Sequence, residues 1–151
     1  MFRGFAAGLI LLACWSVSAE AATFRLQGST IYMTGPIVAA DPLRLSRMID
    51  LGARAIVLES PGGLVATGSY MADLFHAARL TTIVSGECAS ACTMMFYAGT
   101  RRKLTGRLGF HNATDAIGSA RYAAQMKRYG APREALRAAM TTPADRITWL
   151  R

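Results

Sequence analysis

A continuous apolar run that ends in a glycine turn most constrains the fold of this chain. Residues 55–58 read Ala-Ile-Val-Leu, and the segment Ser60-Pro61-Gly62-Gly63 follows after a single glutamate. An apolar run of this length with β-branched members is typical of a strand that is covered on both faces. The turn residues behind it predict a short connection from that strand into a helix. The segment therefore predicts one strand-to-helix unit of a parallel sheet.

Short β-rich runs alternate with helical patterns along the rest of the chain. The expected strands lie at residues 24–26, 30–34, 55–58, 81–84 and 107–110. The expected helices lie at residues 42–51, 65–79, 90–97, 117–129, 132–140 and 143–151, with Asp41 as the N-cap of the first and Thr142 as the cap of the last. This alternation predicts an α/β domain with a parallel β-sheet and flanking helices.

The amino-terminal 21 residues have the pattern of an export signal. Arg3 precedes an apolar run at residues 4–15, and small residues follow at 16–22. Cleavage after Ala19 or Ala21 fits this pattern, so we expect a periplasmic or secreted domain at residues 22–151. In a second interpretation, residues 11–14 form a lipobox, and lipidation of Cys14 attaches the protein to a membrane.

The composition excludes several classes of protein. The chain has 151 residues, of which 52% are hydrophobic and 17% charged, so it is long enough for one domain and too apolar to be disordered. The formal net charge is +8, but the one basic run, at residues 101–103, has no aromatic residues interleaved with it. Nucleic-acid binding is therefore not expected. The basic surface is expected to be solvated and to tolerate anionic envelope surfaces.

Three features lie where strands are expected to end, which is where ligand sites form in open α/β sheets. They are the glycine turn at residues 60–63, the segment 86–92 around Ser90, and His111 directly after the last expected strand. Ser90 is a candidate nucleophile at a helix N-terminus, or else a plain N-cap serine. His111 is a candidate general base, or else a structural histidine. Asp115 and Asp145 are the candidate carboxylates that would orient it.

The order of these motifs resembles the proteolytic subunit of the Clp protease (ClpP), within the crotonase-like superfamily. The resemblance rests on residues 31–35 (Ile-Tyr-Met-Thr-Gly), the Ser-Pro-Gly-Gly turn, the turn at 86–90, and Gly-Phe-His at 109–111. It implies a fold of ββα-type repeats and a serine peptidase that assembles into a homo-oligomer and cleaves peptide or protein substrates. No cofactor or metal is implied.

The resemblance also assigns roles to residues. Ser90 would be the nucleophile, His111 the base and Asp145 the triad carboxylate, because Asp-Arg-Ile at 145–147 fits the family pattern. Gly63 and Ala91 would donate the N–H groups of the oxyanion hole. The interval from His111 to Asp145 (145 − 111 = 34 residues) is shorter than in the family, and only six residues follow Asp145. The segment that docks the family's unfoldase is absent, so no ATPase partner is implied.

Two cysteines bracket the candidate nucleophile. Cys88 and Cys92 lie four residues apart, and export would expose them to an oxidising compartment. They would form a disulfide or remain two small buried thiols; a zinc site with His111 is a third interpretation, although it lacks a fourth ligand.

Two other functions compete with that of a peptidase. The first is a catalytically inactive Clp-like module that binds peptides or assembles through the same groove, which the short interval before Asp145 favours. The second is an acyl-CoA enzyme of the crotonase type, which would not need a serine at position 90.

Overall fold

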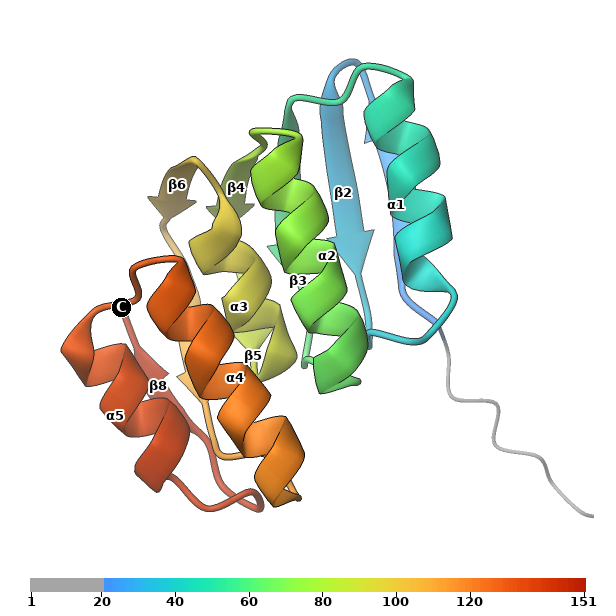
Figure 1. Cartoon of the computed structure of the whole chain (residues 1–151). Helices are drawn as coiled ribbons and strands as arrows, with labels where there is room; N and C mark the ends of the chain where they lie inside the picture. Colours follow the sequence, from blue (N-terminus) through green and yellow to red (C-terminus); the bar gives the residue numbers. More distant parts are fainter. Residues whose placement is uncertain (1–20) are drawn as a thin grey trace, which may run out of the picture.

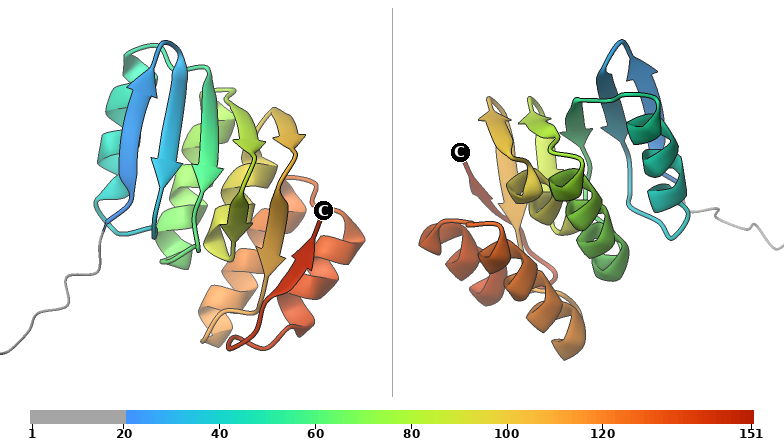
Figure 2. Two further views of the ribbon diagram at one scale, coloured as in Figure 1. Left: turned by 180° about the vertical axis from the view of Figure 1, so that it is seen from behind. Right: turned by 45° about the horizontal axis from the view of Figure 1, so that its top comes forward.

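The computed structural model describes residues 21–151, which form two β-sheets with their helices on one side. Figure 1 shows the helices in front of the strands, and Figure 2 shows the bare strands from behind. The expected export signal, apart from Ala21, and Cys14 lie outside the described residues. Ala22 is fully buried, and its carbonyl oxygen accepts a hydrogen bond of 3.1 Å from Arg44.

The larger sheet has five strands in the order β1-β2-β3-β4-β6. Its first two strands form an antiparallel hairpin, and the others join in parallel. The strands are β1 (Thr23–Gln27), β2 (Thr30–Thr34), β3 (Ala55–Glu59), β4 (Thr81–Val84) and β6 (Arg101–Leu104). The α/β architecture predicted from the sequence is confirmed; the predicted parallel sheet is mostly parallel, with an antiparallel hairpin at one edge.

The smaller sheet consists of β5 (Glu87–Ala89), β7 (Arg107–Phe110) and β8 (Thr148–Leu150). β5 and β7 are parallel, whereas β8 pairs antiparallel with β7. A bridge between Ser60 and Cys88 joins this sheet to the end of β3. The two sheets therefore meet beside the glycine turn.

The helices are α1 (Asp41–Asp50), α2 (Val65–Ala77), α3 (Ala91–Ala98), α4 (Ala116–Arg128) and α5 (Arg133–Thr141). All eight residues of α3 are buried, because α2 and α4 both pack against it. A Cβ atom at Gly68 of α2 would lie 3.0 Å from the Cβ of Ala91, so the glycine permits this close approach. None of the helices in residues 21–151 has the length and hydrophobicity that spanning a bilayer requires.

The prediction that β3 is covered on both faces was wrong. Ile56 and Leu58 are fully buried beneath the helices, whereas Ala55 and Val57 are only half-buried. Because successive side chains of a strand point to opposite faces, this alternation follows from helices on one side only. The apolar run therefore marks a strand in the middle of the sheet, with one face left uncovered by residues 21–151.

Strand β6 was not predicted, because it consists of the basic run Arg101-Arg102-Lys103 and a leucine. Such a run has no apolar periodicity to indicate a strand. In the sheet, β6 lies at an edge, and charged side chains on an edge strand prevent it from pairing with other chains. The basic run therefore has a structural role at this edge.

The prediction of a last helix from Thr142 was also wrong. Residues after Pro143 form a turn, in which the Arg146 N–H donates to the Pro143 carbonyl, and the chain then enters β8. β8 pairs Trp149 with Gly109 of β7, and the ring of Trp149 lies 4.2 Å from the Arg107 guanidinium. This pairing with β7 overrides the local helix-start pattern.

Helix α1 begins one residue earlier than predicted, with Ala40 rather than Asp41 as its N-cap. Asp41 is fully buried, and its Oδ2 accepts a hydrogen bond of 2.7 Å from the Val38 N–H. Its Oδ1 has no partner. Burial raises the pKa of the Asp41 carboxyl group, although the Val38 hydrogen bond and Arg44 oppose this shift.

Candidate active site

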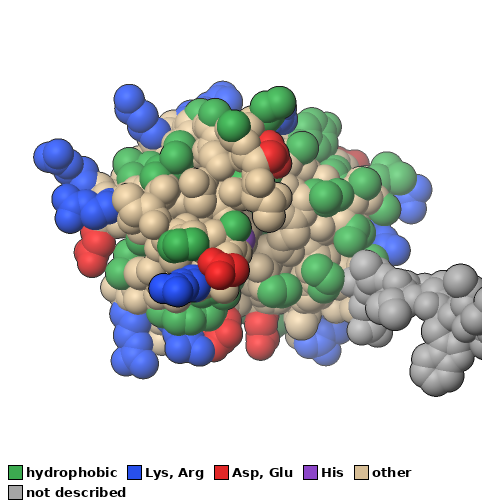
Figure 3. Space-filling view, turned by 90° about the horizontal axis from the view of Figure 1, so that it is seen from below, with side chains coloured by type: hydrophobic (Ala, Val, Ile, Leu, Met, Phe, Trp, Pro, Cys, Tyr) green, Lys and Arg blue, Asp and Glu red, His purple; other side chains and the backbone are tan. Residues whose placement is uncertain are grey.

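Three turns from different strands line one pocket. The turn after β3 brings Gly63, the turn after β5 brings Ser90, and the end of β7 brings His111. The pocket has a volume of about 410 Å³. Figure 3 shows this face of the molecule, where hydrophobic side chains surround a hollow with a histidine visible inside it. The structure thus places the predicted nucleophile and the predicted base in the same pocket.

Ser90 has an unusual backbone conformation, with φ 53° and ψ −129°. Glycine is the residue favoured in this region, and an L-residue there carries strain of order 1–3 kcal/mol. The conformation is maintained by the Ser90 N–H, which donates a hydrogen bond of 2.8 Å to the Gly109 carbonyl of β7. The Ser90 hydroxyl does not cap α3. A plain N-cap serine needs no such strain, so the geometry favours a functional role for the hydroxyl.

The glycine turn packs directly against the Ser90 turn. A Cβ atom at Gly62 would lie 2.6 Å from the Cβ of Ser90 and 2.7 Å from the Ala89 carbonyl oxygen. Gly62 also has φ 96°, which L-residues rarely adopt. Its N–H donates to the Ser60 hydroxyl at 3.1 Å, which stabilises the turn from within. Only glycine at this position allows the two turns to touch.

Gly63 presents its N–H to the pocket because its neighbours form the hydrogen bonds to Ile37. The Ile37 N–H donates to the Gly62 carbonyl, and the Leu64 N–H donates to the Ile37 carbonyl. In this parallel bridge the N–H of Gly63 itself is not used. A Cβ atom at Gly63 would overlap the Ile37 backbone, so this residue too must be glycine.

The N–H of Ala91 is also without a hydrogen-bond acceptor in residues 21–151. Ala91 is the first residue of α3, where N–H groups have no partner within the helix and the helix dipole favours negative charge. Gly63 lines the pocket from the turn after β3, whereas Ala91 directly follows Ser90 and is fully buried, outside the pocket lining.

His111 is half-buried, and its Nδ1 lies 2.7 Å from the carbonyl oxygen of Asn112. A carbonyl oxygen can only accept, so this contact requires the proton on Nδ1 and leaves the lone pair on Nε2. That tautomer is the one that a general base uses toward a serine hydroxyl. The carbonyl of Asn112 was not predicted, because a backbone acceptor has no signature in the sequence.

The structure does not bring either candidate carboxylate to His111. Asp145 lies exposed in the turn before β8 and forms no hydrogen bond or ion pair with any residue of the described chain. Asp115 lines the pocket, but its Oδ1 accepts a hydrogen bond of 2.7 Å from the Gly118 N–H and caps α4. The expected helix that would have carried Asp145 over the sheet is replaced by β8.

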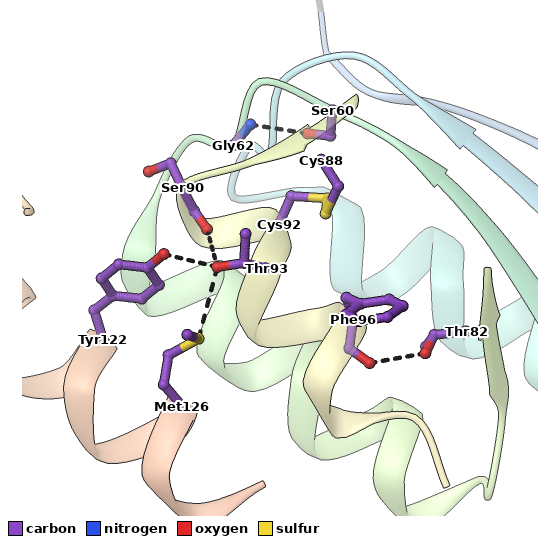
Figure 4. Close-up of a disulfide and its surroundings, with 10 residues drawn as sticks. All are labelled: Ser60, Gly62, Thr82, Cys88, Ser90, Cys92, Thr93, Phe96, Tyr122 and Met126. Atoms are coloured by element: carbon purple, nitrogen blue, oxygen red, sulfur yellow. Dashed lines mark hydrogen bonds between the residues drawn. A yellow bond between two sulfur atoms is a disulfide. The ribbon is translucent and has the colours of Figure 1, made fainter. Parts of the chain in front are cut away.

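Cys88 and Cys92 are joined by a disulfide, with their Cα atoms 5.4 Å apart. Both residues are fully buried, and Figure 4 shows the bond beside the Ser90 turn. The disulfide leaves neither sulfur free to bind zinc. Among residues 21–151, no three His, Cys, Asp or Glu side chains cluster as metal ligands. The bond instead connects the end of β5 to the first turn of α3 across Ser90.

The rims of the pocket are apolar and exposed. Leu64 at the start of α2 is 52% exposed, and Ile117 in the first turn of α4 is 77% exposed. Arg121 of α4 adds a positive charge to the same pocket. The sequence shows these residues only as ordinary helix positions, so nothing in it distinguishes them as lining residues. The pocket therefore combines apolar rims with one cationic side chain.

No protein-family model matches this chain, and no curated protein matches it. Among solved structures, it is similar to the ClpP protease catalytic domain from Plasmodium falciparum, with a TM-score of 0.64 and 21% identity over 81% of this chain and 76% of that chain. It is also similar to a ClpP1 mutant from Listeria monocytogenes, with a TM-score of 0.55 and 20% identity over 81% and 82% of the two chains. This chain therefore has the fold of the ClpP protease catalytic domains.

Proposed function

We propose that this protein is a serine peptidase or a related acyl hydrolase, with Ser90 as the nucleophile and His111 as the general base. The observation that carries the proposal is the strained backbone of Ser90 in the pocket that also contains His111 and Gly63. Strain of this kind concentrates at functional sites, and nucleophilic serines of hydrolases occupy such sharp turns. The ClpP-like fold supports the same function.

In the proposed reaction, Nε2 of His111 accepts the proton of the Ser90 hydroxyl as Oγ attacks the substrate carbonyl carbon. The carbonyl oxygen becomes an oxyanion, which accepts hydrogen bonds from the Gly63 and Ala91 N–H groups. The intermediate collapses, the leaving group takes the proton from His111, and an acyl group remains on Ser90. Water then repeats the sequence, with His111 again as base, and releases the acid.

We propose that the Asn112 carbonyl, rather than Asp145, orients the imidazole. The 2.7 Å contact to Nδ1 selects the required tautomer, which is one of the two tasks of a triad carboxylate. The second task is to stabilise the imidazolium, and a neutral carbonyl does this less well than a charged group. We therefore expect slow turnover, and Asp145→Asn should change the rate by less than about threefold. A loss near 10⁴-fold, as in a serine triad, would show that the turn at Asp145 moves to His111.

The proposal is tested by covalent labelling of the purified mature domain with a fluorophosphonate. A serine activated by a histidine attacks phosphorus as it attacks a carbonyl, so we expect one adduct by intact mass. Ser90→Ala should abolish the adduct and His111→Ala should slow its formation, whereas Ser85→Ala, at an exposed serine, should change nothing. Labelling that survives Ser90→Ala would refute the assignment.

The alternative is a catalytically inactive module that binds an extended peptide in the same pocket. The pocket lining does not include Asp145, which favours this alternative. In that case the wild-type protein forms no adduct, yet peptides with an apolar residue bind to it. Isothermal titration and fluorophosphonate labelling of the wild-type protein together separate the two functions, because only the inactive module binds peptide and forms no adduct.

We also propose that the protein is exported and assembles as a homo-oligomer. The export proposal rests on the basic and apolar pattern at residues 3–15, and the oligomer on the family resemblance. N-terminal sequencing of the mature protein should give a start between residues 20 and 23. A chain that begins at a lipidated Cys14 would instead be membrane-attached, where stable anchoring takes more than one acyl chain.

A further inference from the structure

The carbonyl oxygen of Ser90 accepts a hydrogen bond from a side chain that the catalytic proposal does not use. Thr93 Oγ1 lies 2.8 Å from the Ser90 carbonyl oxygen, and the Thr93 N–H donates to the same oxygen at 2.9 Å. Thr93 is fully buried. Both hydrogen bonds fix the orientation of the peptide unit between Ser90 and Ala91. They therefore fix the ψ angle of Ser90.

A second buried hydroxyl connects this contact to another helix. Thr93 Oγ1 lies 2.7 Å from the hydroxyl oxygen of Tyr122, which is 29 residues further along the chain in α4. A threonine hydroxyl has one proton, and the Ser90 carbonyl can only accept, so Thr93 donates to Ser90 and Tyr122 donates to Thr93. Figure 4 shows the chain of contacts from Tyr122 through Thr93 to Ser90.

The hydroxyl groups of this chain are buried, and the Met126 sulfur atom is a second, weaker acceptor beside Thr93. Tyr122 is 1% exposed, and burial raises the pKa of its hydroxyl, so the hydroxyl remains a donor at every pH at which the protein is studied. Met126 of α4 contributes its sulfur atom, 3.6 Å from Thr93 Oγ1. The helix that supplies these groups also supplies Ile117 and Arg121 to the pocket.

We propose that Thr93 and Tyr122 are positioning residues, which maintain the strained backbone conformation of Ser90 in the pocket that also contains His111. The proposal rests on the proposed nucleophile but does not follow from it, because a nucleophilic serine does not by itself require hydrogen bonds from another helix. The consequence is that α4 couples the wall of the pocket to the nucleophile: the helix that contacts the substrate also sets the orientation of Ser90.

The test compares isosteric substitutions at two buried threonines, Thr93 in α3 and Thr82 in β4, whose hydroxyls bind carbonyl groups at the two ends of α3. Thr93→Val removes the hydroxyl that binds the Ser90 carbonyl. Thr82→Val removes an equally buried hydroxyl that binds the Phe96 carbonyl, at 2.8 Å, near the opposite end of α3. Figure 4 shows both contacts. Each variant therefore loses one hydrogen bond from a threonine hydroxyl to a backbone carbonyl. Only Thr93→Val loses the bond to the Ser90 carbonyl.

The first measurement is the rate of fluorophosphonate labelling at Ser90. Misplacement of a reacting group by about 1 Å costs about 100-fold, so we expect Thr93→Val to slow labelling by about 10-fold to 100-fold. Tyr122→Phe should slow it by a smaller factor, and Thr93→Ser, which keeps the hydroxyl, should restore the wild-type rate. Thr82→Val should remain within twofold of wild type. Equal losses in Thr93→Val and Thr82→Val, or no loss in either, would overturn the proposal.

The second measurement is amide hydrogen exchange at Ser90 and Thr93, whose N–H groups donate to the Gly109 carbonyl of β7 and to the Ser90 carbonyl, respectively. Exchange should be faster in Thr93→Val and unchanged in Thr82→Val. This measurement does not depend on catalysis, so a wild-type protein that forms no adduct would refute the proposed function while exchange still decides on positioning. If Thr93→Val does not fold, Tyr122→Phe decides by the same two measurements, and unchanged exchange in it overturns the proposal.

Discussion

Replacement of Ser90 by glycine should yield a more stable protein than replacement by alanine. Both variants lack the hydroxyl and are inactive under the proposed function. They differ in the Cβ atom, which makes φ 53° and ψ −129° unfavourable for alanine as it is for serine. Because the Ser90 hydroxyl does not cap α3, alanine loses no capping hydrogen bond. The comparison therefore isolates the strain in the turn.

The expected difference follows from two opposing contributions. Release of the strain stabilises the glycine variant by about 1–3 kcal/mol. The greater freedom of glycine in the unfolded chain costs about 0.5–1 kcal/mol. The net difference is about 1 kcal/mol in favour of Ser90→Gly, which corresponds to a melting temperature about 2–4 °C higher in a domain of this size.

Urea unfolding followed by circular dichroism, with thermal melts in parallel, measures this difference. Wild type and Ser90→Ala should have the same midpoint within error, and Ser90→Gly should have a higher one at an unchanged slope. An alanine variant as stable as the glycine variant would mean that the backbone at position 90 is unstrained, and the structural argument for the nucleophile would be refuted.

Three further predictions concern the surroundings of the site. Replacement of both Cys88 and Cys92 by alanine should lower the free energy of unfolding by about 2 kcal/mol, because the disulfide closes a loop of only four residues; urea unfolding with an equal midpoint would contradict this. Since burial raises the pKa of Asp41, its native form binds a proton more readily than the unfolded chain, and its contribution to stability falls as the pH rises above about 4. Asp41→Asn should remove this pH dependence, measured as the difference in unfolding free energy between pH 4 and pH 7; the same difference in both proteins would exclude the effect. Gly63→Ala should lower the free energy of unfolding by at least about 2 kcal/mol, because of its positive φ and the overlap with neighbouring backbone. In the control Gly130→Ala the added Cβ has open space, so the loss should be about 1 kcal/mol. Similar losses of unfolding free energy in both variants would show that the overlap at Gly63 is absent.

Local sequence patterns were enough to predict the core of the fold. The apolar run at β3 and the glycine turn behind it are specified by neighbouring residues. Strand β6 has no such pattern, because its position at an edge requires charge and not an apolar face. β8 is determined by its pairing with β7, about 40 residues earlier in the chain, and the proline after Thr142 points to a helix instead.

The candidate site was predictable to the same extent. Gly63 lies in the turn after β3, His111 directly follows β7, and Ser90 directly follows the short strand β5, which was not predicted; the packing of these strands brings the three residues to one pocket. The partner of Nδ1 is a backbone carbonyl, and the support for the Ser90 carbonyl comes from Tyr122 on a distant helix. Neither contact has a local pattern in the sequence, because each depends on how separate elements pack.

The division of the strands between two sheets has a mechanical consequence for the proposed chemistry. Ser90 and His111 follow β5 and β7, which are hydrogen-bonded neighbours in the smaller sheet, so the two residues move together. Gly63 follows β3 of the larger sheet, and its turn meets the smaller sheet through the bridge from Ser60 to Cys88 and the contact of Gly62 with Ser90. A shift of this turn away from Ser90 would leave the proposed proton transfer from serine to histidine intact while it removed one proposed oxyanion donor. Such a protein would still bind substrate and ionise its nucleophile, but the transition state would lose its stabilisation.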